Sequence, residues 1–238
     1  MKKDKRLFAS MAFHYQALRT LGHVRGANAG ECLAAMRTIR DGDAESWHRS
    51  WYGMGERCEA WAESSGDTVS RGQACLRASN YYRSSEFFLH PADKRKRATY
   101  DKSASMFQKG IAALGIEHEI WRIPYEGAFL RAYFFPGDAD KPLILACGGF
   151  DSTNEESFFW IGLAAVERGY PCIMFEGPGQ SNMIRQYGIA FTPAWERPVK
   201  AILDYAEESR SELRAAVKIL FGISFGGRLA PRPAAQEK

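Results

Sequence analysis

Residues 217–227 read VKILFGISFGG, an apolar, β-rich run that breaks into the pattern G-x-S-x-G at Gly222, Ser224 and Gly226. A strand that ends in this pattern is typical of a nucleophile elbow, a sharp strand-to-helix turn that presents a serine hydroxyl above a sheet. Glycine suits the two flanking positions because a Cβ there would clash in the turn. The alternative is a plain glycine turn that closes a strand. We expect the elbow and assign Ser224 as the catalytic nucleophile.

The composition is that of an ordinary globular protein. The 238 residues are 45% hydrophobic and 13% aromatic, which supports a sizeable core and argues against disorder. The 32 basic and 28 acidic residues leave a mild net charge of +4. Two basic clusters, residues 2–6 and 94–97, are expected to be solvated rather than to contact an acidic partner. No nucleic-acid motif accompanies them, so we expect no nucleic-acid partner.

Membrane and export signals are not recognisable in the sequence. No run of 18 apolar residues is present, and the charged N-terminus lacks the apolar region of a signal peptide. The cysteines are odd in number, scattered, and form no C-x-x-C, which favours reduced thiols over a disulfide framework or a metal site. We therefore expect a cytoplasmic protein with no membrane partner and no metal. The five cysteines are Cys32, Cys58, Cys75, Cys147 and Cys172.

The period of the apolar residues is helical from residue 7 to residue 114. Four stripes recur at steps of three and four, and we interpret them as buried seams between packed helices rather than as an aromatic cofactor site. Gly22 is expected to end the first helix and Asp43 to cap the second. No repeat signature recurs. The stripes are Leu7, Phe8, Met11, Tyr15 and Leu18; Trp47, Trp51, Met54, Cys58 and Trp61; Ala74, Ala78, Tyr81, Ser85 and Phe88; and Tyr100, Ala104, Phe107, Ile111 and Leu114.

After Gly115 the pattern becomes that of strands alternating with helices, which predicts βαβ units and a mainly parallel sheet. The first two strands read as an antiparallel hairpin with its turn at residues 125–127. We therefore expect a helical domain of residues 1–115 and an α/β domain of residues 116–238. The expected strands span 116–123, 129–135, 142–147, 170–175 and 216–221, and the expected helices span 154–168 and 193–209.

Residues 152–156 predict the start of the helix at 154–168. Ser152 and Thr153 are each followed three residues later by a glutamate, Glu155 and Glu156, which makes a doubled capping box.

Residues 148–151, GGFD, follow a buried strand and lead into that helix. Acyl transfer needs two backbone N–H donors for the oxyanion, one from the residue after the nucleophile and one from a loop after an earlier strand. The first is Phe225. We choose Phe150 for the second and keep Gly149 as the fallback. A plain capped strand-to-helix turn is compatible with this oxyanion-hole role.

Residues 176–180, EGPGQ, follow the next strand and contain G-x-G. A dinucleotide fingerprint needs a third glycine, but Asn182 stands at that position. We therefore reject a nicotinamide or flavin site and expect a tight loop at the rim of a catalytic site.

Five segments match one known pattern in order along nearly the whole chain. They are residues 76–83 (LRASNYYR), 123–127 (IPYEG), 148–152 (GGFDS), 175–180 (FEGPGQ) and 222–227 (GISFGG). Together they resemble α/β-hydrolases of the dihydroxypseudooxynicotine hydrolase type, whose relatives include polyketide-shortening hydrolases and serine peptidase-like esterases.

The resemblance implies an α/β-hydrolase fold with an N-terminal all-helical cap domain over the active site and Ser224 as the nucleophile. It implies cleavage of a carbon–carbon bond next to a ketone, or of an ester or amide, in a small-molecule substrate. It also implies no metal or organic cofactor, and a possible homodimer.

One departure from that family is large. In this fold the acid and the histidine of the triad follow the serine, on loops after later strands. After Ser224 the sequence has one carboxylate, Glu237, and no histidine. All five histidines lie upstream, at His14, His23, His48, His90 and His118.

We interpret the sequence as a hydrolase truncated in the helix after its nucleophile, with an incomplete sheet and impaired activity. A base borrowed from an upstream histidine would be unusual for the family. The alternative is a non-catalytic remnant whose helical region serves as an interaction or dimerisation module.

Overall fold

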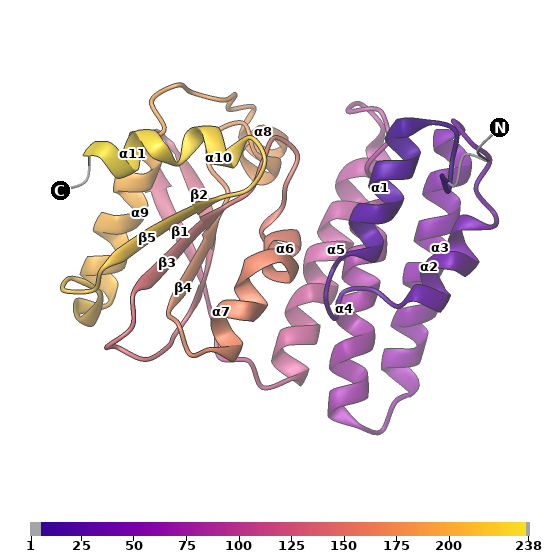
Figure 1. Ribbon diagram of the computed structural model, residues 1–238, viewed down its shortest axis with the longest axis horizontal. Coiled ribbons are helices and arrows are strands. Elements are labelled where there is room, and N and C mark those ends of the chain that lie inside the picture. Colours follow the sequence, from indigo (N-terminus) through magenta and orange to yellow (C-terminus); the bar gives the residue numbers. More distant parts are fainter. Residues whose placement is uncertain (1–5, 237–238) are drawn as a thin grey trace. The chain divides into compact units, whose positions relative to one another are not determined.

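The computed structural model describes residues 6–236, which divide at Ile116 into two compact units (Figure 1). The first unit is all-helical and the second is built on a five-stranded sheet. Each unit has a hydrophobic core of its own. Most of the basic cluster at residues 2–6, and Glu237, lie outside the described residues.

The helical unit contains two short helices and three long ones. Asp43 caps α3 as predicted, because its side chain accepts hydrogen bonds from the backbone N–H groups of Glu45 and Ser46. Trp47 and Trp51 on α3 are fully buried and pack against one another, and Trp51 also packs against Tyr81 of α4. The helices are α1 (Met11–Leu21), α2 (Ala29–Met36), α3 (Ala44–Ser64), α4 (Thr68–Ser85) and α5 (Lys94–Ala113).

The predicted stripe on α1 is wrong. Four of its five members, Leu7, Met11, Tyr15 and Leu18, are between 42% and 59% exposed, while Phe8, which precedes the helix, is buried. The helix instead buries Phe13, Ala17 and Thr20. The reason is tertiary: the Phe13 ring stacks on Phe88 at 4.6 Å, and the Thr20 hydroxyl hydrogen-bonds Ser84 at 2.7 Å. Trp61, at the end of the α3 stripe, is also exposed.

The second unit has a mixed sheet in the order β1-β2-β4-β3-β5. Strands β4, β3 and β5 are parallel, and the hairpin of β1 and β2 adds two antiparallel pairings. Glu126 and Gly127 both have positive φ in the two-residue turn, which is the geometry that hairpins of this length require. The strands are β1 (Glu119–Tyr125), β2 (Ala128–Phe135), β3 (Leu143–Cys147), β4 (Cys172–Phe175) and β5 (Lys218–Gly222).

Helices cover both faces of this sheet (Figure 1). The expected helix at 154–168 is interrupted by a π-helical turn, and α8, which the sequence analysis missed, follows the EGPGQ loop. Thr153 caps α6 by accepting from the Glu156 N–H at 3.1 Å. Ser152 does not cap it, contrary to the doubled capping box, because its hydroxyl accepts from the Gly149 N–H instead. The helical segments are α6 (Asn154–Ser157), η1 (Phe158–Gly162), α7 (Leu163–Glu167), α8 (Ser181–Tyr187), α9 (Glu196–Ser209), η2 (Ser211–Leu213), α10 (Gly226–Leu229) and α11 (Pro231–Gln236).

Strand β5 lies at an edge of the sheet and pairs with β3. One of its faces is uncovered, since Ile219 and Phe221 are about two-fifths exposed. Leu220 points to the other face, where it lines a hollow with Val199 of α9 and Pro233 of α11. Among the described helices, none is long and apolar enough to cross a membrane.

Candidate active site

The elbow at the end of β5 has the geometry that its glycines predict. Ser224 has a φ of 57°, a left-handed conformation that is uncommon for serine, and its side chain is exposed. A Cβ on Gly222 would overlap the carbonyl of Gly226, and a Cβ on Gly226 would lie 2.5 Å from the carbonyl oxygen of Gly148. Both positions therefore require glycine, because neighbouring backbone atoms leave no room for a Cβ. The chain turns directly from the strand into α10.

The two predicted oxyanion donors have free N–H groups. Within residues 6–236, neither Phe150 N–H nor Phe225 N–H donates a hydrogen bond. Gly149, the fallback donor, is unsuitable because its N–H already donates to Ser152 Oγ at 2.8 Å. Phe150 and Phe225 thus each have a backbone N–H without an acceptor among the described residues, in the loops that follow β3 and β5.

No hydrogen-bonded base is seen at Ser224 among the described residues. Its hydroxyl makes no hydrogen bond to them. His118, the histidine of this unit, packs on Phe135, which pairs with the first residue of β4. Ser224 follows the last residue of β5, so His118 lies at the opposite end of the sheet.

The other four histidines belong to the helical unit and bond to neighbours there. His23 and His48 hydrogen-bond the Asn80 side chain and the Ser85 carbonyl. His14 and His90 each accept from a nearby backbone N–H.

A buried polar network, which the sequence analysis missed, supports the loops around Ser224. Glu176 directly follows β4 and is almost fully buried. Its carboxylate accepts from the N–H groups of Asn154 and Asn182 at 2.8 and 2.9 Å, which are the first turns of α6 and α8. Arg131 pairs with both Glu176 and Glu155. An arginine in an apolar strand and a glutamate at a strand end were the signals that could have revealed this network.

Aromatic rings lie on one side of the elbow. The Phe150 ring stacks on Phe191 at 5.2 Å, and Phe225 meets Phe191 edge-on at 5.3 Å. A hollow of about 530 Å³ beside them has aromatic, aliphatic and basic lining residues: Phe191, Thr192, Pro193, Trp195, Phe225, Arg228, Leu229 and Arg232. Apolar, aromatic walls beside a few polar groups are typical of small-molecule sites.

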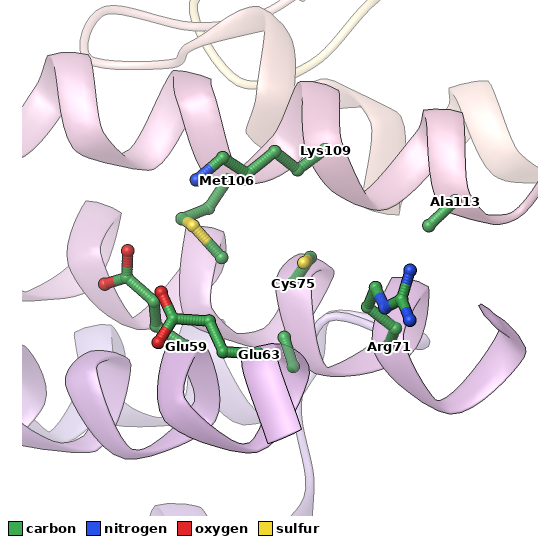
Figure 2. Close-up of a pocket in the computed structure, with 8 residues that line it drawn as sticks. Glu59, Glu63, Arg71, Cys75, Met106, Lys109 and Ala113 are labelled. Atoms are coloured by element: carbon green, nitrogen blue, oxygen red, sulfur yellow. The ribbon is translucent and has the colours of Figure 1, made fainter. Parts of the chain in front are cut away.

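A second hollow, of about 320 Å³, lies in the helical unit between α3, α4 and α5 (Figure 2). Glu59, Glu63, Arg71 and Lys109 surround it, and Cys75 lies among them. Burial raises the pKa of the Cys75 thiol, so this group stays protonated and is a poor nucleophile at neutral pH. The described residues also contain no cluster of three or more metal-ligating side chains.

A parallel strand that ends in a serine elbow, with the loop of an earlier strand beside it, defines the α/β-hydrolase class. Comparisons of sequence agree with this class. The chain is 38% identical over 263 residues to hydrolase acrC of Aspergillus aculeatus, covering 98% of this chain and 61% of that protein. It is 37% identical over 246 residues to 20-hydroxy-prefusarin hydrolase FUS2 of Gibberella moniliformis, covering 96% of this chain and 59% of that protein. No protein-family model matches the sequence.

Solved structures show the same fold. The 2,6-dihydroxy-pseudo-oxynicotine hydrolase superposes with a TM-score of 0.76 at 24% identity, covering 94% of this chain and 61% of that one. The protein AbyA5 superposes with a TM-score of 0.58 at 20% identity, covering 88% and 57%. The chain is therefore similar in sequence to α/β-hydrolases and shares their fold, as its motifs predict. It spans about three-fifths of the length of the relatives it matches.

Proposed function

We propose that Ser224 is the acyl-accepting nucleophile of a serine-dependent hydrolase that cleaves a ketone carbon–carbon, ester or amide bond in a small organic molecule. The observation that carries the proposal is the exposed Ser224 at a φ of 57°, on a strand-to-helix turn with two unbonded N–H groups in the adjoining loops. The names of FUS2 and of the solved pseudo-oxynicotine hydrolase support a small organic substrate.

The chemistry follows from these groups. Ser224 Oγ attacks the carbonyl carbon and gives its proton to a base, while the carbonyl π electrons move to the oxygen. The N–H groups of Phe150 and Phe225 donate to that oxyanion. Collapse of the tetrahedral intermediate expels the alcohol, the amine or the carbon leaving group, which takes up the proton. Water then hydrolyses the acyl-serine and regenerates the hydroxyl.

We propose that this chain by itself is impaired, because no histidine follows Ser224 in its sequence. A serine hydroxyl without a general base is a poor nucleophile near neutral pH. Loss of triad members removes on the order of 10⁴ to 10⁶ of the rate, while an oxyanion hole leaves some residual catalysis. The quantity to measure is therefore the slow reaction of Ser224 that remains without a general base.

Added imidazole tests this proposal, because it supplies the missing base. We expect an aryl acetate to acetylate Ser224 slowly in buffer and faster as the imidazole concentration rises, with the adduct located by peptide mass spectrometry. Ser224→Ala abolishes the adduct. Ser211→Ala, at an exposed serine of the same unit, leaves it unchanged. Equal rates for the parent chain and Ser224→Ala at every imidazole concentration would contradict the proposal and favour the non-catalytic alternative.

A further inference from the structure

Gln180 connects the EGPGQ loop to the loop that follows β3. It directly precedes α8, and it is about 1% exposed. Its Nε2 donates to the carbonyl oxygens of Gly148 and Gly149 at 2.7 and 3.0 Å, and its Oε1 accepts from the Gly177 N–H at 2.9 Å. Both donor hydrogens of the buried amide are therefore used on the loop that carries Phe150.

These hydrogen bonds determine the direction of the Phe150 N–H. The carbonyl of Gly149 and the N–H of Phe150 belong to one planar, trans peptide unit, in which the two groups point in opposite directions. Because Gln180 holds the carbonyl on the buried side of the loop, the N–H faces the other way and stays unbonded.

The neighbouring peptide unit is held as well. The Gly149 N–H donates to Ser152 Oγ, and the Gly148 carbonyl accepts from Gln180. The loop thus has two successive peptide planes fixed by side chains. A glycine pair has little conformational preference of its own, so the side chains of Gln180 and Ser152 fix the backbone conformation of this loop.

We infer that Gln180 is a positioning residue that aims the Phe150 N–H at the oxyanion formed on Ser224; this role rests on the function proposed above. Gln180 does not touch the reacting atoms. Its removal frees the Gly149 carbonyl, and the peptide unit can rotate, so that one of two oxyanion donors is lost from its aligned position.

The test compares acetylation of Ser224 by an aryl acetate and by the matching aryl thionoacetate, in imidazole. Attack on the ester places charge on oxygen, whereas attack on the thionoester places it on sulfur, a weaker acceptor that gains less from N–H donors. We expect Gln180→Ala and Gln180→Glu to lower the ester rate by about 10- to 100-fold and to leave the thionoester rate within about threefold. The ratio of the two rates reports on the oxyanion donors rather than on the fold.

The matched control is Asn154→Ala. Asn154 is equally buried, and its side chain donates to the Arg131 carbonyl without touching the glycine pair. We expect this variant to keep the ratio of the parent chain. If Gln180→Ala lowers both rates equally, or changes the ratio no more than Asn154→Ala, the inference is overturned while acetylation of Ser224 in the parent chain still stands.

A second measurement does not depend on activity. In ¹⁵N relaxation experiments we expect the Phe150 amide to be ordered in the parent chain and in Asn154→Ala. In Gln180→Ala we expect exchange broadening at Phe150. An unchanged, ordered Phe150 amide in Gln180→Ala overturns the inference even if Ser224 proves to be unreactive, an outcome that would separately contradict the proposed function.

Discussion

Gly149, in the loop after β3, lies directly against Ser224, although more than seventy residues separate the two in the sequence. A Cβ built on Gly149 would stand 2.9 Å from Ser224 Cβ and 3.1 Å from Ser224 Oγ. The hydroxyl therefore has its position only because residue 149 has no side chain.

Gly149→Ala is expected to displace Ser224 and slow its acetylation in imidazole. Overpacking of this kind costs about 1–3 kcal/mol of the free energy of unfolding. The control is Gly53→Ala in α3, where an added Cβ meets nothing within 4 Å and should stabilise the helix by about 0.5–1 kcal/mol. Urea unfolding and mass spectrometry of the acetyl adduct measure the two effects, and normal labelling of Ser224 in Gly149→Ala would contradict the expectation.

Glu176→Gln is expected to destabilise the sheet unit. The glutamate is buried, pairs with Arg131, and accepts from the first turns of α6 and α8. Arg131 keeps Glu155 in this variant, so the loss is that of the charged acceptor of the two backbone N–H groups, which typically costs about 1–3 kcal/mol at a buried site. As a control, Asp204→Asn removes the exposed ion pair with Lys200 and should change the free energy of unfolding by less than about 1 kcal/mol. Equal urea midpoints for the two variants would refute this assignment.

Alkaline pH is expected to weaken the fold through its buried thiols. Burial raises the pKa of Cys147 and Cys172 to about 12, whereas unfolded cysteine titrates near pH 8.5. The folded state holds these protons more tightly, so the resulting stability is complete below about pH 8.5 and is lost as the pH rises towards 12. The urea midpoint should fall between pH 8 and pH 10.5, and the fall should be smaller in Cys172→Ala. A flat profile over that range would show that the thiols do not contribute.

Self-association is expected through the edge strand β5. Its face bearing Ile219 and Phe221 is uncovered, and an apolar edge strand favours pairing with another chain. Ile219→Lys should reduce association, because a charge on the strand opposes a second strand. Val69→Lys, at an exposed residue of α4, is the control. Sedimentation velocity over a range of concentrations compares the association of the parent chain and the two variants. A parent chain that stays monomeric throughout would rule out this role for β5.

The local features of the chain could be predicted well from sequence. The sharp strand-to-helix turn at Ser224, the cap at Asp43 and the hairpin turn at Glu126 and Gly127 agree with expectation. Each depends on a few consecutive residues, because glycine spacing and capping side chains act over a single turn. The motif pattern also predicted the α/β-hydrolase class, which the relatives confirm.

The predictions that proved wrong concern side chains whose partners lie far away in the sequence. The stripe on α1 has a helical period, but the period does not say which face is buried, and packing of Phe13 against Phe88 turned the other face inward. Ser152 fits a capping box by sequence, yet its hydroxyl bonds to the Gly149 N–H. The Ser152 hydroxyl could accept a hydrogen bond either from the first turn of α6 or from the preceding loop, and the tertiary structure determines which bond forms.

The sequence by itself determined where the strand ends, that Ser224 stands in a strained turn, and that Gly222 and Gly226 permit it, because these are properties of neighbouring residues. Only the tertiary structure decided that Gln180 holds the loop of Phe150 and that Glu176 joins the starts of α6 and α8. The Gln180–Gly149 bond spans 31 residues and the Glu176–Asn154 bond spans 22, whereas the Glu176–Asn182 bond spans only six. A side chain finds such partners only after the parallel strands have brought their ends together, and no local pattern encodes that meeting.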